Sequence, residues 1–263
     1  MIEIINLRKK FGDRWISNGV DLKIPKNKMT VIIGRSGEGK SVLLKQIIGL
    51  IKPTSGKVIV DGVNITELDE AGLRKMYEKF GYVFQFAALL DSLNVLENIG
   101  LTLLENNDMP MEEIVKIVQE KIALVNLKQE ILYKYPNELS GGMKKRVGLA
   151  RTLVRNPEII LYDEPTTGLD PITSRIVHEL MADMQKKFKI TSLVVSHDVE
   201  IFKYADYVAL LNAGKIRYFG EAKDIWECDN PYVHQFIRGL PNGPMGTDAQ
   251  VDIDPALAEQ EDE

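Results

Sequence analysis

The 263-residue chain lacks the features that mark secreted and membrane-spanning proteins. It has one cysteine, Cys228, so no disulfide can form within it, and we expect a reducing compartment. No apolar run approaches the ~18 residues that a membrane-spanning helix needs. The first residues do not show the basic and then apolar pattern of a signal peptide. Any membrane role is therefore expected to come through a partner.

An excess of basic residues is also missing. Residues 241–263 contain seven acidic residues and no lysine or arginine, while the whole chain has a formal charge of −5. Without those seven acids the first 240 residues carry a net charge of +2, which is not the basic surface typical of nucleic-acid-binding proteins. With 44% hydrophobic and 27% charged residues, the composition is that of an ordinary globular protein. We therefore expect a globular body, an acidic tail and no nucleic-acid partner.

One stretch matches the phosphate-binding pattern G-x-x-x-x-G-K-[ST] at every required position: Gly34, Arg35, Ser36, Gly37, Glu38, Gly39, Lys40 and Ser41. Apolar residues before and after it predict a buried strand over 29–33 and a helix over 41–48. Glycines allow consecutive backbone N–H groups to surround phosphate oxygens, and the helix dipole adds positive charge. Lys40 would contact the terminal phosphates and Ser41 would ligate Mg²⁺. The stretch predicts a nucleoside triphosphate site.

Four polar residues stand at the ends of other apolar strands. They are Gln85, Asp163, Glu164 and His197. Because α/β sheets bind ligands beyond the carboxyl ends of their strands, we expect all four beside the phosphate loop. Gln85 would ligate Mg²⁺ or hold the attacking water, Asp163 would belong to the Mg²⁺ shell, and Glu164 would take a proton from the water or orient it. The other two histidines, His178 and His234, lie in helical stretches and are expected at the surface.

A second helix start offers free N–H groups near residue 140. Ser140 is a natural N-cap, and Gly141 and Gly142 leave the first N–H groups of the helix open to an anion. This end is not expected to fold back onto the phosphate loop, so the sequence suggests a nucleotide shared between two copies of the chain. The basic residues that follow, 144–146, are expected to form a solvated face.

Three other features leave alternatives or partners open. Phe11, beside a turn, would either stack on a purine base or anchor a small core. The apolar residues 86–90 would either pack inside or form a hydrophobic groove for a partner, and we favour the groove. Asp170 caps a helix that begins at Pro171, and the loop before it could face a partner copy.

The apolar segments alternate in type along the chain, which predicts an α/β fold with a parallel-sheet core, an antiparallel β layer and a helical part. The expected strands are 2–11, 20–24, 29–33, 57–60, 81–84, 158–164, 191–196, 206–211 and 215–219. The expected helices are 41–48, a helical stretch over 95–127, 140–155, one from residue 171, 222–227 and 231–239.

These motifs together resemble those of the ABC ATPases, over about residues 1–225. The resemblance makes 34–41 the Walker A loop, Gln85 the Q-loop, 139–143 the signature motif, 159–164 Walker B, 168–170 the D-loop with Asp170, and His197 the switch histidine. It places Phe11 at the adenine-stacking position, which is usually a tyrosine. It also implies a head-to-tail dimer, in which Ser140, Gly141, Gly142 and Met143 of one protomer close on the ATP held by the other.

Two residues depart from the family pattern. Met143 stands where glutamine is usual, and Glu38 places a carboxylate in a loop that more often has a small residue there. We expect the Glu38 side chain to point to solvent, because a like charge beside a triphosphate would be costly.

The segments FQFAALLDSLNVLEN (84–98), LSGGM, DEPTTGLDPIT and LPNGP are similar to those of Mla/Mce-type phospholipid-transport ATPases. This resemblance implies a dimer at the cytoplasmic face of the inner membrane, docked on two permease subunits with an Mce-domain lipid-binding protein. It also implies an ATPase domain over 1–240, with a helical subdomain over 92–156, and an extension, 241–263, that would reach the partner ATPase subunit.

Other functions are weighed against this one. An ATPase subunit for another solute, such as an amino acid, would have the same ATP site. A DNA-repair type would need a long coiled coil between Lys40 and Ser140, for which the chain has no room, and translation types usually join two cassettes in one chain. A catalytically silent subunit would not need Lys40, Glu164 and His197 together.

Overall fold

The fold is built on two β-sheets, and the computed structural model describes residues 1–105 and 109–246. The larger sheet has the strand order β10 (Lys215–Glu221), β9 (Tyr207–Asn212), β3 (Met29–Ile33), β8 (Thr191–Val195), β7 (Ile159–Asp163), β6 (Phe80–Val83). Adjacent strands in this sheet are parallel, except that β10 pairs antiparallel with β9. The register pairs Ile32 with Val195 and Asp163 with Val195, so the carboxyl ends of three strands lie level with one another.

The smaller sheet is antiparallel, with the order β2 (Arg14–Ile24), β1 (Ile2–Phe11), β4 (Ser55–Val60), β5 (Val63–Asn64). Helix α1 (Lys40–Ile47) lies between the two sheets, because its apolar side chains join one buried cluster with residues of both. Leu43, Leu44 and Ile47 pack there against Ile4 of β1 and Leu161 of β7. This burial fixes the helix that follows the phosphate loop.

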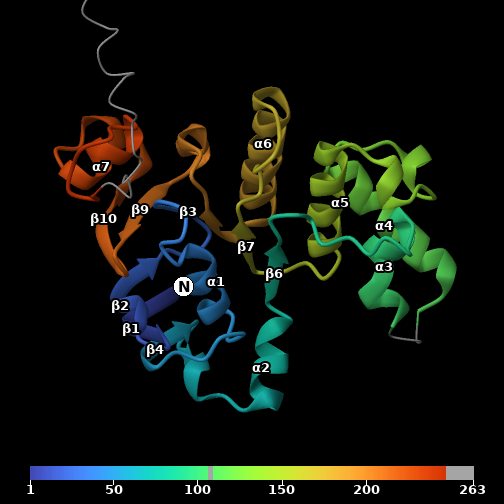
Figure 1. Ribbon diagram of the computed structural model, residues 1–263. Coiled ribbons are helices and arrows are strands. Elements are labelled where there is room, and N and C mark those ends of the chain that lie inside the picture. Colours follow the sequence, from blue (N-terminus) through green and yellow to red (C-terminus); the bar gives the residue numbers. More distant parts are fainter. Residues whose placement is uncertain (106–108, 247–263) are drawn as a thin grey trace, which may run out of the picture.

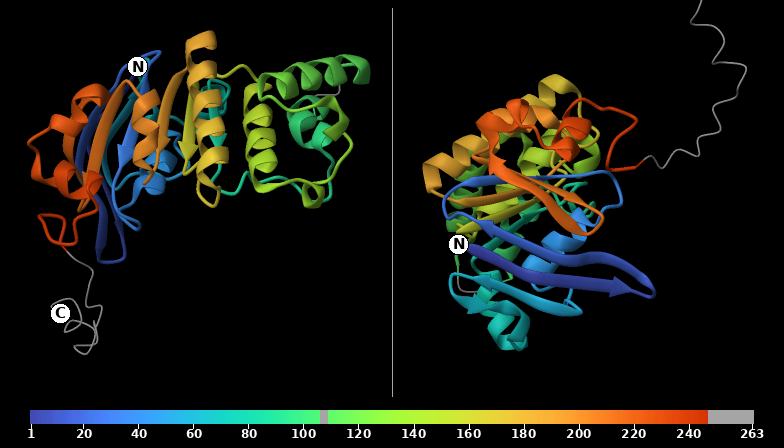
Figure 2. Two further views of the ribbon diagram at one scale, coloured as in Figure 1. Left: turned by 90° about the horizontal axis from the view of Figure 1, so that it is seen from above. Right: turned by 90° about the vertical axis from the view of Figure 1, so that its left-hand side faces the viewer.

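The remaining long helices share a second buried core with residues on the other face of the larger sheet. Along β3, Val31 and Ile33 belong to this second core while Ile32 belongs to the first, as the two-residue period of a strand requires. The helices are α3 (Val95–Leu104), α4 (Met111–Leu124), α5 (Gly141–Leu153) and α6 (Pro171–Phe188). Figures 1 and 2 show α3, α4 and α5 gathered beyond β6, while α7 (Pro231–Ile237) lies at the opposite side near β10.

The predicted α/β fold class is confirmed, with differences in single elements. The helical stretch predicted for 95–127 is two helices, α3 and α4, and β2 begins at Arg14 rather than at residue 20. Residues 222–227 form a 3₁₀ helix, and α2 (Glu70–Tyr77) was not predicted. None of the helices that the structure describes is long and apolar enough to cross a membrane. Residues 247–263 of the acidic extension lie outside the described residues.

Candidate active site

The phosphate loop connects β3 to α1 as predicted. Gly37 and Gly39 have φ angles of +81° and +91°, a region that favours glycine, and a Cβ on Gly39 would lie 2.3 Å from Ile16 Cγ2. The N-cap of α1 is Gly39, which has no side chain to accept a hydrogen bond from the first backbone N–H groups of the helix. A loop of this form at an uncapped helix start fits a phosphate group.

Lys40 is the cation of this loop and is almost fully buried, with 6% of its surface exposed. Its Nζ donates to the carbonyl oxygens of Gly34 (2.8 Å) and Arg35 (3.0 Å) and lies 3.8 Å from Glu164 Oε1. Burial lowers the pKa of Lys40, and the carboxylates of Glu164, Glu38 and Asp163 oppose that shift in this order. The ammonium group is thus held between the loop carbonyls and the end of β7.

Asp163 at the end of β7 is contacted by two hydroxyl groups. Ser41 Oγ donates to Oδ1 over 2.6 Å, and the Tyr82 hydroxyl donates to Oδ2 over 2.9 Å. Burial in the first place, and then the charge of Asp163, raises the pKa of Tyr82, so its hydroxyl keeps the proton that it donates. The Ser41 hydroxyl and the Asp163 carboxylate are the hard oxygen ligands that Mg²⁺ prefers. The donor set fits the metal, and Tyr82 is a site residue that the sequence analysis missed.

Glu164 and His197 meet as the strand-end argument predicts. His197 Nδ1 lies 2.6 Å from Glu164 Oε2, and the Thr167 hydroxyl donates to the same oxygen over 3.1 Å. At this distance Nδ1 donates a hydrogen bond to the carboxylate, since an ionised carboxylate only accepts. Glu164 has a left-handed φ of +50°, and its backbone N–H donates to Val195 O. Such a conformation costs about 1–3 kcal/mol in a residue with a side chain, and it turns the carboxylate toward Lys40.

Gln85 follows β6, and cations of α5 hold the segment that begins with it. Lys145 Nζ donates to the Gln85 carbonyl, and the Arg151 guanidinium donates to the carbonyls of Ala87 and Ala88, each over 2.7 Å. Lys145 is only 7% exposed, and burial lowers its pKa. The prediction of a solvated face over 144–146 is therefore wrong for Lys145. The sequence did contain a clue to this burial, because the helical period places Lys145 on the same face of α5 as the buried Gly142 and Leu149.

The predicted partner-facing residues near Gln85 are divided between core and surface. Phe86 is 79% exposed and Leu90 is 46% exposed, while Ala87 is buried against Gly148. Phe11, at the end of β1, is also exposed, and Lys9 Nζ lies 4.8 Å from its ring centroid. Neither Phe11 nor Phe86 anchors a core.

Glu38 does not point to solvent, contrary to our expectation. Its Oε2 accepts from the backbone N–H of Ala213 over 2.6 Å, and its Oε1 accepts from Asn212 Nδ2 over 3.1 Å. These residues form the turn between β9 and β10, which packs close to the loop, because a Cβ on Gly34 would lie 2.4 Å from Leu211 O. The carboxylate is satisfied by this turn, a contact between residues 174 positions apart that no local pattern reveals.

Arg35 connects the loop to the segment after α7. Its Nη1 donates to Gly246 O over 3.0 Å and lies 3.5 Å from Met245 O. The described part of the extension, residues 241–246, thus contacts the phosphate loop of its own chain. The predicted contact between the rest of the extension and a partner protomer falls on residues outside the described part.

The second helix end is formed as predicted. Ser140 caps α5 by accepting from Met143 N over 3.3 Å, and Asp170 caps α6 by accepting from Ile172 N and Thr173 N over 3.0 Å each. A Cβ on Gly142 would lie 2.4 Å from Thr173 Cγ2, so the starts of the two helices are in close contact. Within the described residues, no hydrogen bond or ion pair joins 140–143 to the loop 34–41.

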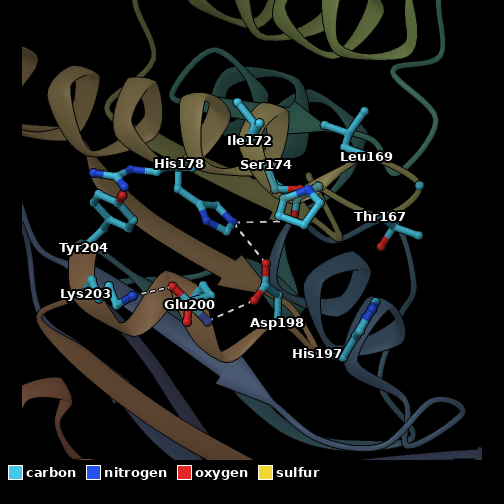
Figure 3. A pocket seen from close by; sticks show the side chains of 14 residues that line it. Thr167, Leu169, Ile172, Ser174, His178, His197, Asp198, Glu200, Lys203 and Tyr204 are labelled. Atoms are coloured by element: carbon cyan, nitrogen blue, oxygen red, sulfur yellow. Dashed lines mark hydrogen bonds and ion pairs between the residues drawn. The ribbon is translucent and has the colours of Figure 1, made fainter.

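A cavity of about 710 Å³ lies beside His197, between the start of α6 and the 3₁₀ helix Val199–Tyr204. Figure 3 shows His178 directed from α6 toward Asp198. His178 Nε2 lies 3.4 Å from Thr166 Oγ1 and 3.9 Å from Asp198 Oδ2. With 1% exposure His178 is buried, so the predicted surface location is wrong; His234 is half-buried. Burial lowers the pKa of His178, against the charges of Asp198 and Glu200.

The sequence profile of a family described as ABC transporter matches residues 17–167. The chain belongs to the ABC transporter family. The "Probable ribonucleotide transport ATP-binding protein mkl" of Mycobacterium tuberculosis is 39% identical over 261 residues, covering 99% of this ABC protein and 72% of the relative. The "Intermembrane phospholipid transport system ATP-binding protein MlaF" of Haemophilus influenzae is 35% identical over 246 residues, covering 93% of each chain. The predicted resemblance is thereby confirmed.

A solved structure extends the comparison to the fold. The dimeric post-hydrolysis structure of the ATP-binding cassette MJ0796, bound to ADP and Pi, superposes with a TM-score of 0.78 at 33% identity. It covers 84% of this chain and 99% of the neighbour. This ABC protein is therefore an ATPase subunit of an ABC transporter, and ATP and Mg²⁺ are the nucleotide and the metal that it uses.

Proposed function

We propose that this subunit hydrolyses ATP for a transporter that moves phospholipid across or between bacterial envelope membranes. The observation that carries the proposal is the similarity to MlaF, which is 35% identical and aligns over 93% of both chains. The residues 84–98 and the terminal LPNGP point the same way through their resemblance to Mla/Mce-type ATPases.

The roles of the site residues follow from their positions. Lys40 and the N–H groups of the loop 34–41 bind the phosphates, and Ser41, Asp163 and Gln85 hold the metal, which neutralises phosphate charge when it is bound. Glu164 accepts the proton of the attacking water or orients it, and its carboxylate lies 3.8 Å from the Lys40 ammonium group that binds the phosphates. His197, hydrogen-bonded to Glu164 through Nδ1, presents its other nitrogen to the γ-phosphate. Phe11 stacks on the adenine.

The working unit in this proposal is a head-to-tail homodimer. Among the described residues, the helix end at Ser140, Gly141, Gly142 and Met143 makes no hydrogen bond or ion pair to the phosphate loop of its own chain. An anion is expected there, because the helix start combines a dipole with free N–H groups. The partner's ATP supplies that anion, and Asp170 stands beside the closing surface. The dimeric form of the similar cassette MJ0796 supports this arrangement.

The membrane partner docks near Gln85. Phe86 and Leu90 are exposed there, while Lys145 and Arg151 hold the backbone beneath them. An exposed apolar pair on a well-anchored segment suits a protein partner. We place the subunit at the cytoplasmic face of the inner membrane, peripheral, on two permease subunits with an Mce-domain protein in the complex. The ATPase domain comprises residues 1–240, with a helical subdomain over 92–156, and nucleic acid is not a partner.

A second candidate keeps the ATPase and changes the solute. The relative mkl, named for ribonucleotide transport, is 39% identical over 99% of this chain, a higher identity than that of MlaF. The ATP sites of the two candidates would be alike, because the transported molecule does not touch this subunit.

The permease decides between the two candidates. The tagged protein is isolated from native membranes in mild detergent, and its protein and lipid partners are identified by mass spectrometry. A permease with an Mce-domain protein and phospholipid supports lipid transport. A different permease with a soluble solute-binding protein overturns the lipid assignment and leaves the ATPase in place.

The assignment of Glu164 has its own test. Glu164→Gln keeps the size of the side chain and removes the proton acceptor, so we expect it to trap an ATP-bound dimer that gel filtration separates from the monomer. Lys40→Ala serves as the comparison, since it is expected to abolish nucleotide binding and dimer formation together. Retained steady-state hydrolysis by Glu164→Gln would remove Glu164 from the role of base.

A further inference from the structure

Tyr82 is the one member of the β6–β7 pair whose hydroxyl reaches the site described above. It lies in β6 opposite Leu161 of β7, and its hydroxyl extends past that position to Asp163 Oδ2 at 2.9 Å. The ring packs on Phe84 with centroids 4.5 Å apart. The tyrosine is thereby held from both sides, by the neighbouring strand and by the aromatic residue that precedes Gln85.

The hydrogen bond from Tyr82 restricts the terminal side-chain torsion of Asp163. The terminal torsion of an aspartate is broad and roughly two-fold, so a single contact does not fix which oxygen faces a ligand. Asp163 has two contacts, with Ser41 on Oδ1 and Tyr82 on Oδ2. The carboxylate is only 7% exposed, so water has little access to replace either donor. Together the two hydroxyls define the plane of the carboxylate.

We propose that Tyr82 is a positioning residue for the metal site: its hydroxyl holds Oδ2 of Asp163 so that Oδ1 stays directed at Ser41, where Mg²⁺ binds. This role rests on the proposed function of Asp163 and Ser41 as the metal-holding pair. Carboxylates that ligate metals are commonly oriented by outer hydrogen bonds, and loss of such a partner costs about 10–100-fold in metal affinity or activity. Loss of the Tyr82 hydroxyl therefore weakens metal binding without removing a ligand.

Tyr82→Phe tests this role, because it keeps the ring and its contact with Phe84 and removes only the hydroxyl. The matched control is Tyr162→Phe. Tyr162 is the neighbour of Asp163 in β7, so its side chain points to the opposite face of the sheet, into the core, where it is 1% exposed. Both variants lose one tyrosine hydroxyl from adjacent strands, half-buried at Tyr82 and buried at Tyr162, and only Tyr82→Phe loses a contact with Asp163.

Two affinities of the full chain are measured. The first is the affinity for the fluorescent analogue trinitrophenyl-ATP, once with Mg²⁺ and once with EDTA. The second is the affinity for Mn²⁺ in the nucleotide complex, measured by electron paramagnetic resonance. For Tyr82→Phe we expect unchanged affinity in EDTA and a loss of about tenfold in Mn²⁺ affinity. Tyr162→Phe is expected to match the wild type in both. Unchanged affinity in EDTA also shows that the variant is folded, since the phosphate loop must be intact to bind.

Asp163→Asn separates failure of the inference from failure of the site. If Asp163→Asn loses Mn²⁺ affinity and Tyr82→Phe does not, the positioning role is overturned and the metal site stands. If Asp163→Asn keeps wild-type Mn²⁺ affinity, the metal role of Asp163 itself is overturned, and the role of Tyr82 with it. Equal losses in Tyr82→Phe and Tyr162→Phe would also overturn the inference, because they would reflect general loosening of the sheet.

Discussion

Glu38 joins the phosphate loop to the turn between β9 and β10, and its removal should cost measurable stability. The carboxylate accepts from Ala213 N over 2.6 Å and from Asn212 Nδ2 over 3.1 Å. Hydrogen bonds to charged groups contribute about 1.5–3 kcal/mol each when they are buried, and Glu38 is half-buried. We therefore expect Glu38→Ala to lower the free energy of unfolding by about 2 kcal/mol, a value below the sum of two buried bonds.

A double-mutant cycle with Asn212→Ala isolates one of the two bonds. Because the Asn212 amide contacts Glu38 directly, the two substitutions should be non-additive by about 1 kcal/mol. Glu38→Gln is the intermediate variant, since its amide oxygen still accepts from Ala213 N–H while the charge is lost, and we expect about half the loss of Glu38→Ala.

Urea unfolding followed by circular dichroism gives these free energies. In a chain of this size a loss of 1 kcal/mol also lowers the melting temperature by about 2–4 °C, which provides a second measurement. Additivity of Glu38→Ala and Asn212→Ala to within about 0.3 kcal/mol would refute the bond between Glu38 and Asn212 in solution, and an unchanged free energy of unfolding in Glu38→Ala would refute both bonds to the turn.

Two further predictions concern buried groups outside the loop. Since burial holds the pKa of His178 below its ordinary 6.5, the unfolded chain binds a proton there before the folded chain does. The free energy of unfolding should therefore fall as the pH drops below 6.5. In His178→Gln the urea midpoints at pH 7.5 and pH 5.5 should lie closer together than in the wild type. An unchanged difference between the two midpoints contradicts this prediction. Lys145→Met leaves the Gln85 carbonyl without its donor, so hydrogen exchange should accelerate at residues 85–90 but not in α1. An equal change in the exchange rate of residues 85–90 and of α1 would contradict the anchoring role of Lys145.

The outcome for the polar residues at the strand ends shows what local pattern can predict. Asp163, Glu164 and His197 were expected beside the phosphate loop because parallel strands present their carboxyl ends at one edge. The structure brings Asp163 to Ser41 and brings Glu164 to Lys40 and His197. These positions depend only on strand order and on where each apolar run stops.

Side-chain partners were predicted less well than positions. Lys145 and His178 were expected at the surface, and both are buried. Lys145 looked like one of three consecutive basic residues, and such a run usually faces solvent. Its buried position depends on the Gln85 carbonyl, which is 60 residues away in the chain. His178 is buried because Thr166 and Asp198, from two different strand-end loops, meet at its ring.

The sequence by itself determined the fold class, the family and the residues of the phosphate loop, since each of these depends on the spacing of residues close together in the chain. The tertiary structure alone decided which hydroxyl orients Asp163, what satisfies Glu38, and which segment Arg35 contacts. Tyr82 and Asp163 are 81 residues apart, and Glu38 and Asn212 are 174 apart. Contacts over such separations form only after the strands have paired, because a single hydrogen bond contributes too little to select its partner from an unfolded chain.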